Sequence, residues 1–270
     1  MPTSKTILIT GAGSGFGEGA AIGLAQAGHH VIAGVQISPQ VTALRQKAAA
    51  LGLQDKLRVE KLDILDSYDV KNALKWDIDV LFSNAGIGES GPVFEIPLDL
   101  VRGNYETNVF APLHLAQQFI IKWIAGHKPG KIVFTSSMGG LFTPSGYGIY
   151  VSTKHALEAI AEALADELKP YHIKVQTINP GAYLTGYNET MADNAFRWLD
   201  DDKNFTKRAD MKANFDSLLG TPEGRLDPQE MIEAMIKIVP SDTGKFRNVV
   251  PQFVEDMLKE HQTKAWENTI

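Results

Sequence analysis

Short apolar runs alternate along this chain with longer stretches whose apolar residues recur at helical spacing. The runs are four to six residues long, and several are rich in Val and Ile, which is typical of strands covered on both faces. They predict strands at residues 6–10, 31–35, 57–62, 80–83, 132–136, 173–178 and 246–250. Between them lie stretches with apolar residues at helical spacing, and the longest of these stretches cover residues 98–124 and 150–169. The alternation predicts an α/β fold, a doubly wound parallel β-sheet with helices on both faces and a ligand crevice at the carboxyl ends of the strands.

Composition agrees with one domain. The chain has 270 residues, of which 44% are hydrophobic, and this is enough for one substantial core, so we expect a single domain over residues 1–270. It contains no cysteine, which excludes thiolate catalysis, disulfides and Cys-ligated zinc, and we predict no metal site. The net charge of −6 disfavours nucleic acid as a partner. The first predicted strand begins close to Met1 and no apolar run is long enough for a bilayer, so we expect a cytoplasmic protein without membrane contact.

A glycine-rich segment, TGAGSGFG, joins the first predicted strand to a helical stretch over residues 18–27. Gly11, Gly15 and Gly17 permit a sharp turn and the close approach of a pyrophosphate, whose charge would meet unpaired N–H groups at the start of the helix. The spacing is G-x-x-x-G-x-G, which differs from the G-x-G-x-x-G fingerprint and from the phosphate loop that ends in Lys-Ser or Lys-Thr. We interpret the segment as a phosphate cradle, with an ordinary glycine-rich turn as the alternative.

A tyrosine and a lysine, Tyr150 and Lys154, are four residues apart and would face the same way on a helix. A phenol exchanges protons poorly at neutral pH because its ordinary pKa is about 10. A neighbouring ammonium favours the phenolate, so we expect Lys154 to lower the pKa of Tyr150. Such a pair is by itself more typical of a solvated helix face. Its interpretation therefore depends on the other motifs of the chain.

Four motifs in order identify the chain as resembling the short-chain dehydrogenase/reductase family in its compact, single-domain form. TGAGSGFG resembles the family's T-G-x-x-x-G-x-G, Asn84-Ala85-Gly86 resembles its N-A-G, Tyr150 with Lys154 resembles its Y-x-x-x-K, and Pro180-Gly181 followed by Thr185 resembles its P-G segment. The match runs nearly end to end. It implies a Rossmann-like fold and an NAD(P)-dependent oxidoreductase that acts on CH–OH and C=O groups.

The resemblance implies a role for each polar residue of the predicted site. Tyr150 would exchange the proton as hydride moves, Lys154 would hold down the Tyr150 pKa and hydrogen-bond the nicotinamide ribose, and Ser137 would orient the substrate oxygen. Ser136 is the alternative for the last role, but the spacing of thirteen residues to Tyr150 favours Ser137. Asn108, in ETNVF, resembles the helical Asn that keeps a water in a proton relay through the lysine.

The resemblance also implies the cofactor-binding residues. Asp63 resembles the acid that meets the adenine amino group, and Asn84 resembles the residue that steadies the sheet beside the cofactor. Thr185, Pro180 and the backbone near Tyr183 would meet the nicotinamide carboxamide. The predicted set is Gly11, Ser14, Gly15, Phe16, Gly17, Gln36, Asp63, Ile64, Asn84, Ala85, Gly86, Tyr150, Lys154, Pro180, Gly181, Tyr183 and Thr185.

The choice between NAD and NADP depends on the end of the second predicted strand. A carboxylate there would bind the ribose hydroxyls and repel a 2′-phosphate, whereas an Arg would accept the phosphate. This chain has Gln36, and Ser14 in the glycine turn is also neutral. We predict NAD(P), with NADP marginally favoured because the repelling acid is missing.

Residues 186–225 are dense in apolar bulk, which predicts a lid over the substrate pocket or a pair of helices covering the sheet. Within them, residues 200–202 are three aspartates that we interpret as a solvated turn. Met138, Leu141, Phe142 and Tyr183 flank the predicted reacting centre. We therefore predict a small-molecule substrate that is a fairly apolar ketone or secondary alcohol.

Residues 251–270 mix apolar side chains with charges and predict a terminal helix that packs on the body or on a neighbouring subunit. The family resemblance implies a homo-oligomer, a dimer or a tetramer, formed through the helices predicted at 98–124 and 150–169.

Two other classes of function remain open. One is a dinucleotide-binding redox sensor whose catalysis has lapsed, and the intact set of Ser137, Tyr150, Lys154 and Asn108 disfavours it. The other is a nucleotide-sugar epimerase or dehydratase, which commonly spaces its glycines G-x-x-G-x-x-G and adds a larger C-terminal domain. Neither feature is seen in this sequence.

Overall fold

The computed structural model describes residues 4–267 and residue 269. Within them a parallel sheet has the strand order β3-β2-β1-β4-β5-β6-β7. The strands are β1 (Thr6–Thr10), β2 (His30–Val35), β3 (Leu57–Lys61), β4 (Val80–Ser83), β5 (Gly130–Thr135), β6 (Ile173–Pro180) and β7 (Arg247–Val250). The chain order reverses between β1 and β4, so the predicted doubly wound sheet is confirmed, with strand ends that shift by up to two residues. At such a reversal the loops separate at the carboxyl ends of the strands and leave a crevice.

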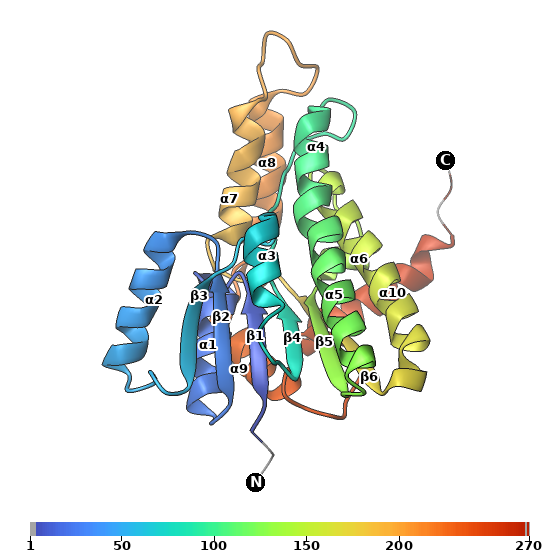
Figure 1. Ribbon diagram of the computed structural model, residues 1–270. Helices are drawn as coiled ribbons and strands as arrows, with labels where there is room; N and C mark the ends of the chain where they lie inside the picture. The colour runs from blue at the N-terminus through green and yellow to red at the C-terminus, as the bar shows by residue number, and fades with distance from the viewer. Residues whose placement is uncertain (1–3, 268, 270) are drawn as a thin grey trace.

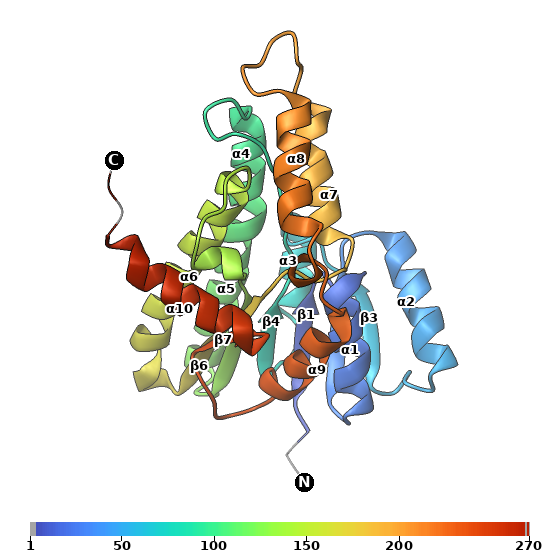
Figure 2. The same ribbon diagram turned by 180° about the vertical axis from the view of Figure 1, so that it is seen from behind.

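Helices cover both faces of the sheet (Figures 1 and 2). They are α1 (Gly15–Gln26), α2 (Ser38–Ala50), α3 (Ser67–Ala73), α4 (Leu98–Tyr105), α5 (Ala111–Ala125), α6 (Gly148–Glu167), α7 (Tyr187–Asn194), α8 (Arg208–Leu219), α9 (Pro228–Ile238) and α10 (Gln252–Ala265). On one face α1, α2 and α9 bury residues such as Leu24, Leu44 and Met231. On the other, α3, α5 and α6 bury residues such as Leu115 and Leu157. Each face of the sheet thus has its own apolar core.

The long helix predicted at 98–124 is interrupted. α4 and α5 are separated by a π-helical turn, η1 (Glu106–Phe110). Pro112 stands in the first turn of α5, and because proline has no N–H it cannot donate to the carbonyl of Asn108 as an α-helix requires. The wider turn accommodates this missing bond, and π-helical turns of this kind are frequent at functional sites. The apolar period alone did not predict the interruption.

Residues 186–225 form a pair of short helices, α7 and α8, that stands over the carboxyl ends of the strands instead of lying on a sheet face (Figure 1). Their inner side chains, including Met191, Met211 and Phe215, pack on Tyr147 and Tyr150 at the start of α6. Hydrogen bonds hold α7 to the segment after β4: Ser90 Oγ donates to the carbonyls of Met191 and Ala192, and Asn194 Nδ2 donates to the carbonyl of Gly88 at 2.8 Å. The predicted solvated turn at residues 200–202 lies in the loop between the two helices.

The terminal helix predicted over residues 251–270 is present as α10, and its buried residues Val254 and Leu258 pack on the body of the same chain. They contact the segment that follows Ser137 through Met138, Leu141 and Phe142. Residues 268 and 270 of the predicted tail lie outside the described residues. In the part of the chain that the structure describes, no helix has the length and apolar character needed to cross a membrane.

Candidate active site

A cavity of about 760 Å³ lies at the carboxyl ends of the strands. Residues from the glycine turn, from the ends of β2 to β6, from α6 and from α7 line it. It brings together every residue predicted to bind the cofactor, and Ser137 with them. Of the predicted catalytic residues only Asn108 does not line the cavity.

The glycine turn is shaped by steric necessity. Gly11 and Gly15 have φ angles of +67° and +53°, a conformation that side chains other than glycine rarely adopt. A Cβ on Gly17 would lie 2.2 Å from the carbonyl oxygen of Gly11. Ser14 precedes α1 without capping its first N–H groups through its side chain. The start of α1 therefore presents unpaired N–H groups and a positive dipole end to the cavity, which suits a pyrophosphate.

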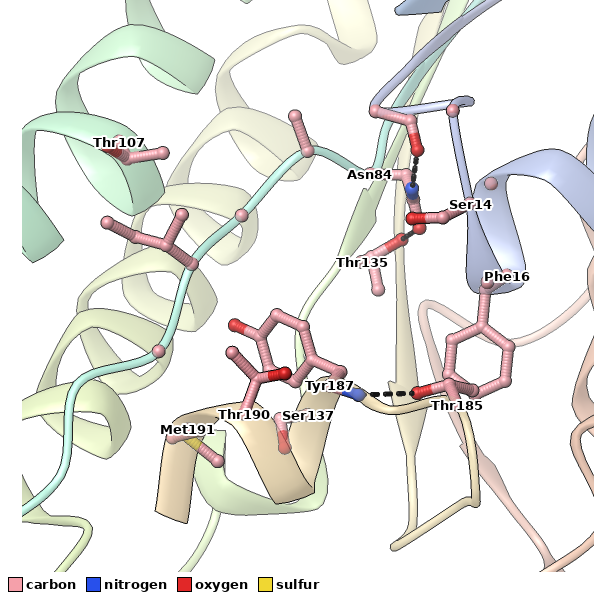
Figure 3. Close-up of a pocket in the computed structure, with 18 of the residues that line it drawn as sticks. Ser14, Phe16, Asn84, Thr107, Thr135, Ser137, Thr185, Tyr187, Thr190 and Met191 are labelled. Atoms are coloured by element: carbon pink, nitrogen blue, oxygen red, sulfur yellow. Dashed lines mark hydrogen bonds between the residues drawn. The ribbon is translucent and has the colours of Figure 1, made fainter. Parts of the chain in front are cut away.

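Asn84, at the end of β4, links three strands. Its Nδ2 donates to the carbonyls of Thr10 at 3.2 Å and Gly11 at 3.3 Å, and its Oδ1 accepts from Thr135 Oγ1 at 3.1 Å (Figure 3). The backbone N–H of Asn84 also donates to Thr10 Oγ1 at 3.0 Å. These bonds fix the glycine turn against the ends of β4 and β5, a geometry in which the side chain supports the cavity wall.

Tyr150, Lys154 and Ser137 meet in the same cavity. Both α6 residues are buried, and the Lys154 Nζ lies 5.7 Å from the centre of the Tyr150 ring. Lys154 Nζ donates to the carbonyl of Thr135 at 2.9 Å, which anchors it at the end of β5. Ser137 begins the 3₁₀ turn η2 (Met138–Gly140), where its Oγ accepts from the N–H of Gly139 at 3.0 Å. A hydrogen bond from Ser137 reaches Tyr150, whereas the buried Ser136 hydroxyl has no partner among the described residues.

The expected low pKa of Tyr150 is wrong for this structure. Burial raises the pKa of the Tyr150 phenol above its ordinary value, and hydrogen bonds from Ser137 and Tyr187 only partly oppose that rise. On burial the phenolate loses more solvation free energy than the hydrogen bonds from these two hydroxyls restore. Tyr150 is therefore a neutral phenol at neutral pH, a state that donates a proton.

Lys154 stays largely charged at neutral pH. Burial lowers its pKa to about 8, against the opposing charge of Glu158 one turn further along α6. Lys154 therefore keeps its positive charge close to Tyr150, although burial has removed part of its hydration. Lys154 would lose its proton within a unit or two above neutral pH.

Asn108 lies in η1 beside the lysine, although it does not reach the cavity. Its Oδ1 accepts from the N–H of Ile87 at 2.9 Å, and its Nδ2 donates to the carbonyl of Ile87 at 2.7 Å and to Thr153 Oγ1 at 3.0 Å. A Cβ on Gly86 would lie 3.2 Å from Asn108 Oδ1 and 3.7 Å from Lys154 Nζ. Asn108 thus fixes the backbone of Gly86 and Ile87, which lies between its side chain and Lys154.

At the other end of the cavity, Gln36 and Asp63 lie side by side. Gln36 Nε2 donates to Asp63 Oδ2 at 3.4 Å. Gln40, which sequence reasoning missed, also lines the cavity. Its Oε1 accepts from the N–H groups of Gln36 and Ile37 at 3.1 and 3.2 Å, and a Cβ on Gly13 would overlap its amide. The only available signal was its place at the start of a helix, where Gln commonly accepts such bonds.

Tyr187 is the most informative residue that the sequence did not assign to the site. The sequence of residues 186–225 shows only apolar bulk, yet the Tyr187 ring lies 5.9 Å from that of Tyr150, and its hydroxyl hydrogen-bonds the Tyr150 hydroxyl. Burial raises the pKa of Tyr187 well above its ordinary value, so it is also neutral. Figure 3 shows Tyr187 facing the cavity beside Thr190, with its N–H bonded to Thr185 Oγ1. No motif spacing connects residues 150 and 187.

Known proteins resemble this chain over most of its length. The family model described as short chain dehydrogenase matches residues 5–195. The uncharacterized oxidoreductase YusZ of Bacillus subtilis is 32% identical over 239 residues, which are 87% of this chain and 84% of that protein. The 3-ketodihydrosphingosine reductase of Bacteroides thetaiotaomicron is 28% identical, over 97% of this chain and 93% of that protein. Among solved structures, a short-chain dehydrogenase from Streptomyces avermitilis has a TM-score of 0.78 and 26% identity, over 99% of this chain and 95% of that one.

Proposed function

Because this chain belongs to the short-chain dehydrogenase family and is an NAD(P)-dependent oxidoreductase, we propose that it transfers hydride between the nicotinamide and a fairly apolar ketone or secondary alcohol, with Tyr150 as general acid or base. The observation that carries the proposal is the meeting of Ser137, Tyr150 and Lys154 in the cavity that the glycine turn also lines. A proton donor and a phosphate cradle in one cavity are what such a transfer requires.

The residues of the cavity suit a dinucleotide. The glycine turn would hold the pyrophosphate, Asp63 and Ile64 the adenine end, and Thr185 with Pro180, Gly181 and Tyr183 the nicotinamide end. When bound, NAD(P)H supplies the hydride and NAD(P)⁺ accepts it.

The protonation of Tyr150 favours the reduction of a carbonyl. A buried, neutral phenol carries the proton that a carbonyl oxygen needs as negative charge develops on it. Ser137 would donate a second hydrogen bond to the same oxygen. Lys154, as an ammonium, stabilises the phenolate that Tyr150 becomes after the transfer. Asn108, whose side chain is bonded to Ile87 and Thr153, would support the replacement of the proton only indirectly, through the backbone that it holds beside the lysine.

The substrate end of the cavity favours an uncharged group. Apart from Lys154 and Asp63, no charged side chain lines the cavity among the described residues. Ile87 and Met191 supply apolar contacts, and Thr107 and Thr190 supply neutral polar ones. A phosphorylated or anionic substrate would lose its solvation without a counter-charge. A relative named 3-ketodihydrosphingosine reductase supports a keto substrate, and the α7–α8 pair would act as the lid over it.

NADP remains marginally favoured over NAD because position 36 carries a neutral Gln and not an acidic side chain. The preference should be small, because no Lys or Arg other than Lys154 lines the cavity among the described residues. A 2′-phosphate would therefore be neither repelled by residue 36 nor bound by a cation.

The test is turnover of purified protein with NADPH and NADH against matched ketones and anionic sugars, followed by the absorbance of the reduced nicotinamide. We expect reduction of the ketones and a loss of at least about 100-fold in kcat for Tyr150→Phe, which keeps the ring and removes only the hydroxyl that carries the proton. Nucleotide affinity of the variant, measured by fluorescence titration, should match the parent protein. Undiminished turnover in Tyr150→Phe would overturn the mechanism, and tight nucleotide binding without any turnover by the parent would favour a redox sensor.

A further inference from the structure

A buried carboxylate lies behind the catalytic residues and outside the cavity. Glu158 follows Lys154 by one turn of α6, and its side chain is only 6% exposed. A buried carboxylate is costly unless charged or polar donors surround it. Glu158 has two such donors: Arg247 Nε of β7 at 2.9 Å and Asn179 Nδ2 of β6 at 2.6 Å.

Asn179 connects Glu158 to the catalytic serine. The same Nδ2 also donates to the carbonyl of Ser137 at 3.1 Å, and Asn179 Oδ1 accepts from Thr177 Oγ1 at 2.9 Å. Asn179 is completely buried, so water does not replace these bonds. The amide therefore has one orientation, in which it ties the Ser137 backbone to the carboxylate.

The turn after Ser137 lies directly against Glu158. A Cβ on Gly140 would be 3.0 Å from Glu158 Cγ and 2.7 Å from Ser136 Oγ. Any displacement of the Glu158 side chain would thus act on η2, which directly follows Ser137, the residue whose hydroxyl hydrogen-bonds Tyr150. The carboxylate fixes this turn by contact and by hydrogen bonding together.

Glu158 is also the negative charge that acts on Lys154. Its field raises the pKa of Lys154, while burial lowers that pKa to about 8. The groups that face Lys154 from η1, from the end of β5 and from the segment after β4 are Asn108, Thr135 and Gly86, all uncharged. From α6 itself the Tyr150 ring faces Lys154, with Tyr187 of α7 behind it, and both phenols are neutral. Arg247 is on the far side of Glu158 and is 35% exposed.

We propose that Glu158, Asn179 and Arg247 form a positioning network that fixes the Ser137 turn and supplies the negative charge which keeps Lys154 in its ammonium form. The inference rests on the proposed reduction by Tyr150. It assigns a positioning role in that site to residues that do not line the cavity. An ion pair with a merely structural role would tie β7 to α6 without affecting the protonation of Lys154.

The discriminating variant is Glu158→Gln, which keeps an oxygen for Asn179 and removes the charge. We expect the alkaline limb of the kcat profile for ketone reduction to move about one pH unit lower, because the charge that favours the ammonium is gone. Titration of the Lys154 Nζ by nitrogen-15 NMR, assigned with Lys154→Met, should show the same shift independently of turnover. Thermal unfolding of each variant confirms that it is folded.

Arg247→Met is the matched control. It breaks the same ion pair, and the longer one between Arg247 and Glu162 at 3.7 Å, but leaves the negative charge of Glu158, so the alkaline limb should stay or move higher. Equal downward shifts in both variants, or none in Glu158→Gln by either measurement, would overturn the network. Tyr150→Phe separates the two proposals: if it retains turnover the proposed mechanism fails, whereas its inactivity beside an unshifted Glu158→Gln profile removes only the network.

Discussion

The glycine turn and the α7–α8 pair line the same cavity but form it by different means. The turn is constrained by backbone: a Cβ on Gly17 would meet the carbonyl oxygen of Gly11, and a Cβ on Gly11 would meet the Cα of Ala85. The α7–α8 pair is held by side chains, with Met191 over Gly88 and Tyr187 against Tyr150. Backbone contacts require glycine at fixed positions, whereas side-chain contacts can be replaced by others of similar volume.

The difference explains why one region is recognisable in a sequence and the other is not. A turn that only glycine can make leaves a spacing in the sequence, as in TGAGSGFG, and the spacing of Tyr150 and Lys154 depends on one helical turn. A cavity wall made of apolar side chains leaves no fixed spacing in the sequence, only a high content of large apolar residues, as in residues 186–225. Three substitutions sharpen the contrast.

The largest effect is expected for Gly17→Ala. The added Cβ would lie 2.2 Å from the Gly11 oxygen and 2.7 Å from Asn84 Nδ2, and neither backbone nor this bonded amide can yield cheaply. Overpacking of this kind costs up to about 3 kcal/mol, so nucleotide affinity should fall roughly 100-fold. Isothermal titration with NADPH measures it, beside the unfolding temperature.

Two alanines provide its controls. Gly88→Ala places a Cβ 2.4 Å from Met191 Sδ, but a methionine changes rotamer readily, so we expect unchanged nucleotide affinity and a change of less than about threefold in substrate kcat/KM. Gly103→Ala, in α4, meets no atom within 4 Å and should alter neither quantity. A Gly88→Ala effect on nucleotide affinity as large as that of Gly17→Ala would end the contrast.

A smaller effect is expected for Gln36→Asp. A carboxylate at this exposed position would face the 2′-phosphate of NADP, and the repulsion of about 2 kcal/mol should lower the NADPH to NADH ratio of kcat/KM roughly 30-fold. Gln36→Asn, which is equally short and neutral, should leave the ratio near its parent value. If both variants change the ratio alike, length and not charge determines the choice of cofactor.

The smallest effect is expected for Tyr187→Phe in the α7–α8 pair. The hydroxyl that it removes lowers the pKa of Tyr150, so the phenol becomes a weaker acid and loses one hydrogen bond of about 1.4 kcal/mol at most. We expect kcat/KM to fall about 10-fold with nucleotide affinity unchanged. The control is Tyr147→Phe, because the Tyr147 hydroxyl is buried with no hydrogen-bond partner among the described residues. An equal loss in both variants would mean that packing, not the hydroxyl, is responsible.

Much of the fold follows from periodicity. The strands at 6–10 and 80–83 have the predicted ends, because runs of Val, Ile and Leu covered on both faces end where polar or glycine residues begin. The helix predicted at 98–124 was wrong as one element, since the effect of Pro112 on the preceding turn depends on hydrogen bonding and not on hydrophobic period. The prediction of a low pKa for Tyr150 also failed, because a pKa depends on burial that a sequence does not give.

Apart from Gln40, the contacts that the sequence missed join distant residues. Tyr187 meets Tyr150 across 37 positions, and Arg247 meets Glu158 across 89. Neither pair has a fixed spacing, since the intervening β6 and loops can vary in length without changing the contact. Only the three-dimensional arrangement joins them.

The packing of α10 on the segment after Ser137 has an evolutionary consequence. Leu258 and Val254 share one small cluster with Met138, Leu141 and Phe142, so a volume change on one side is tolerated only with a compensating change on the other. Sequences that diverge in the last helix should therefore diverge together with this segment. Mutations in a helix that does not line the cavity would thereby change the segment next to Ser137.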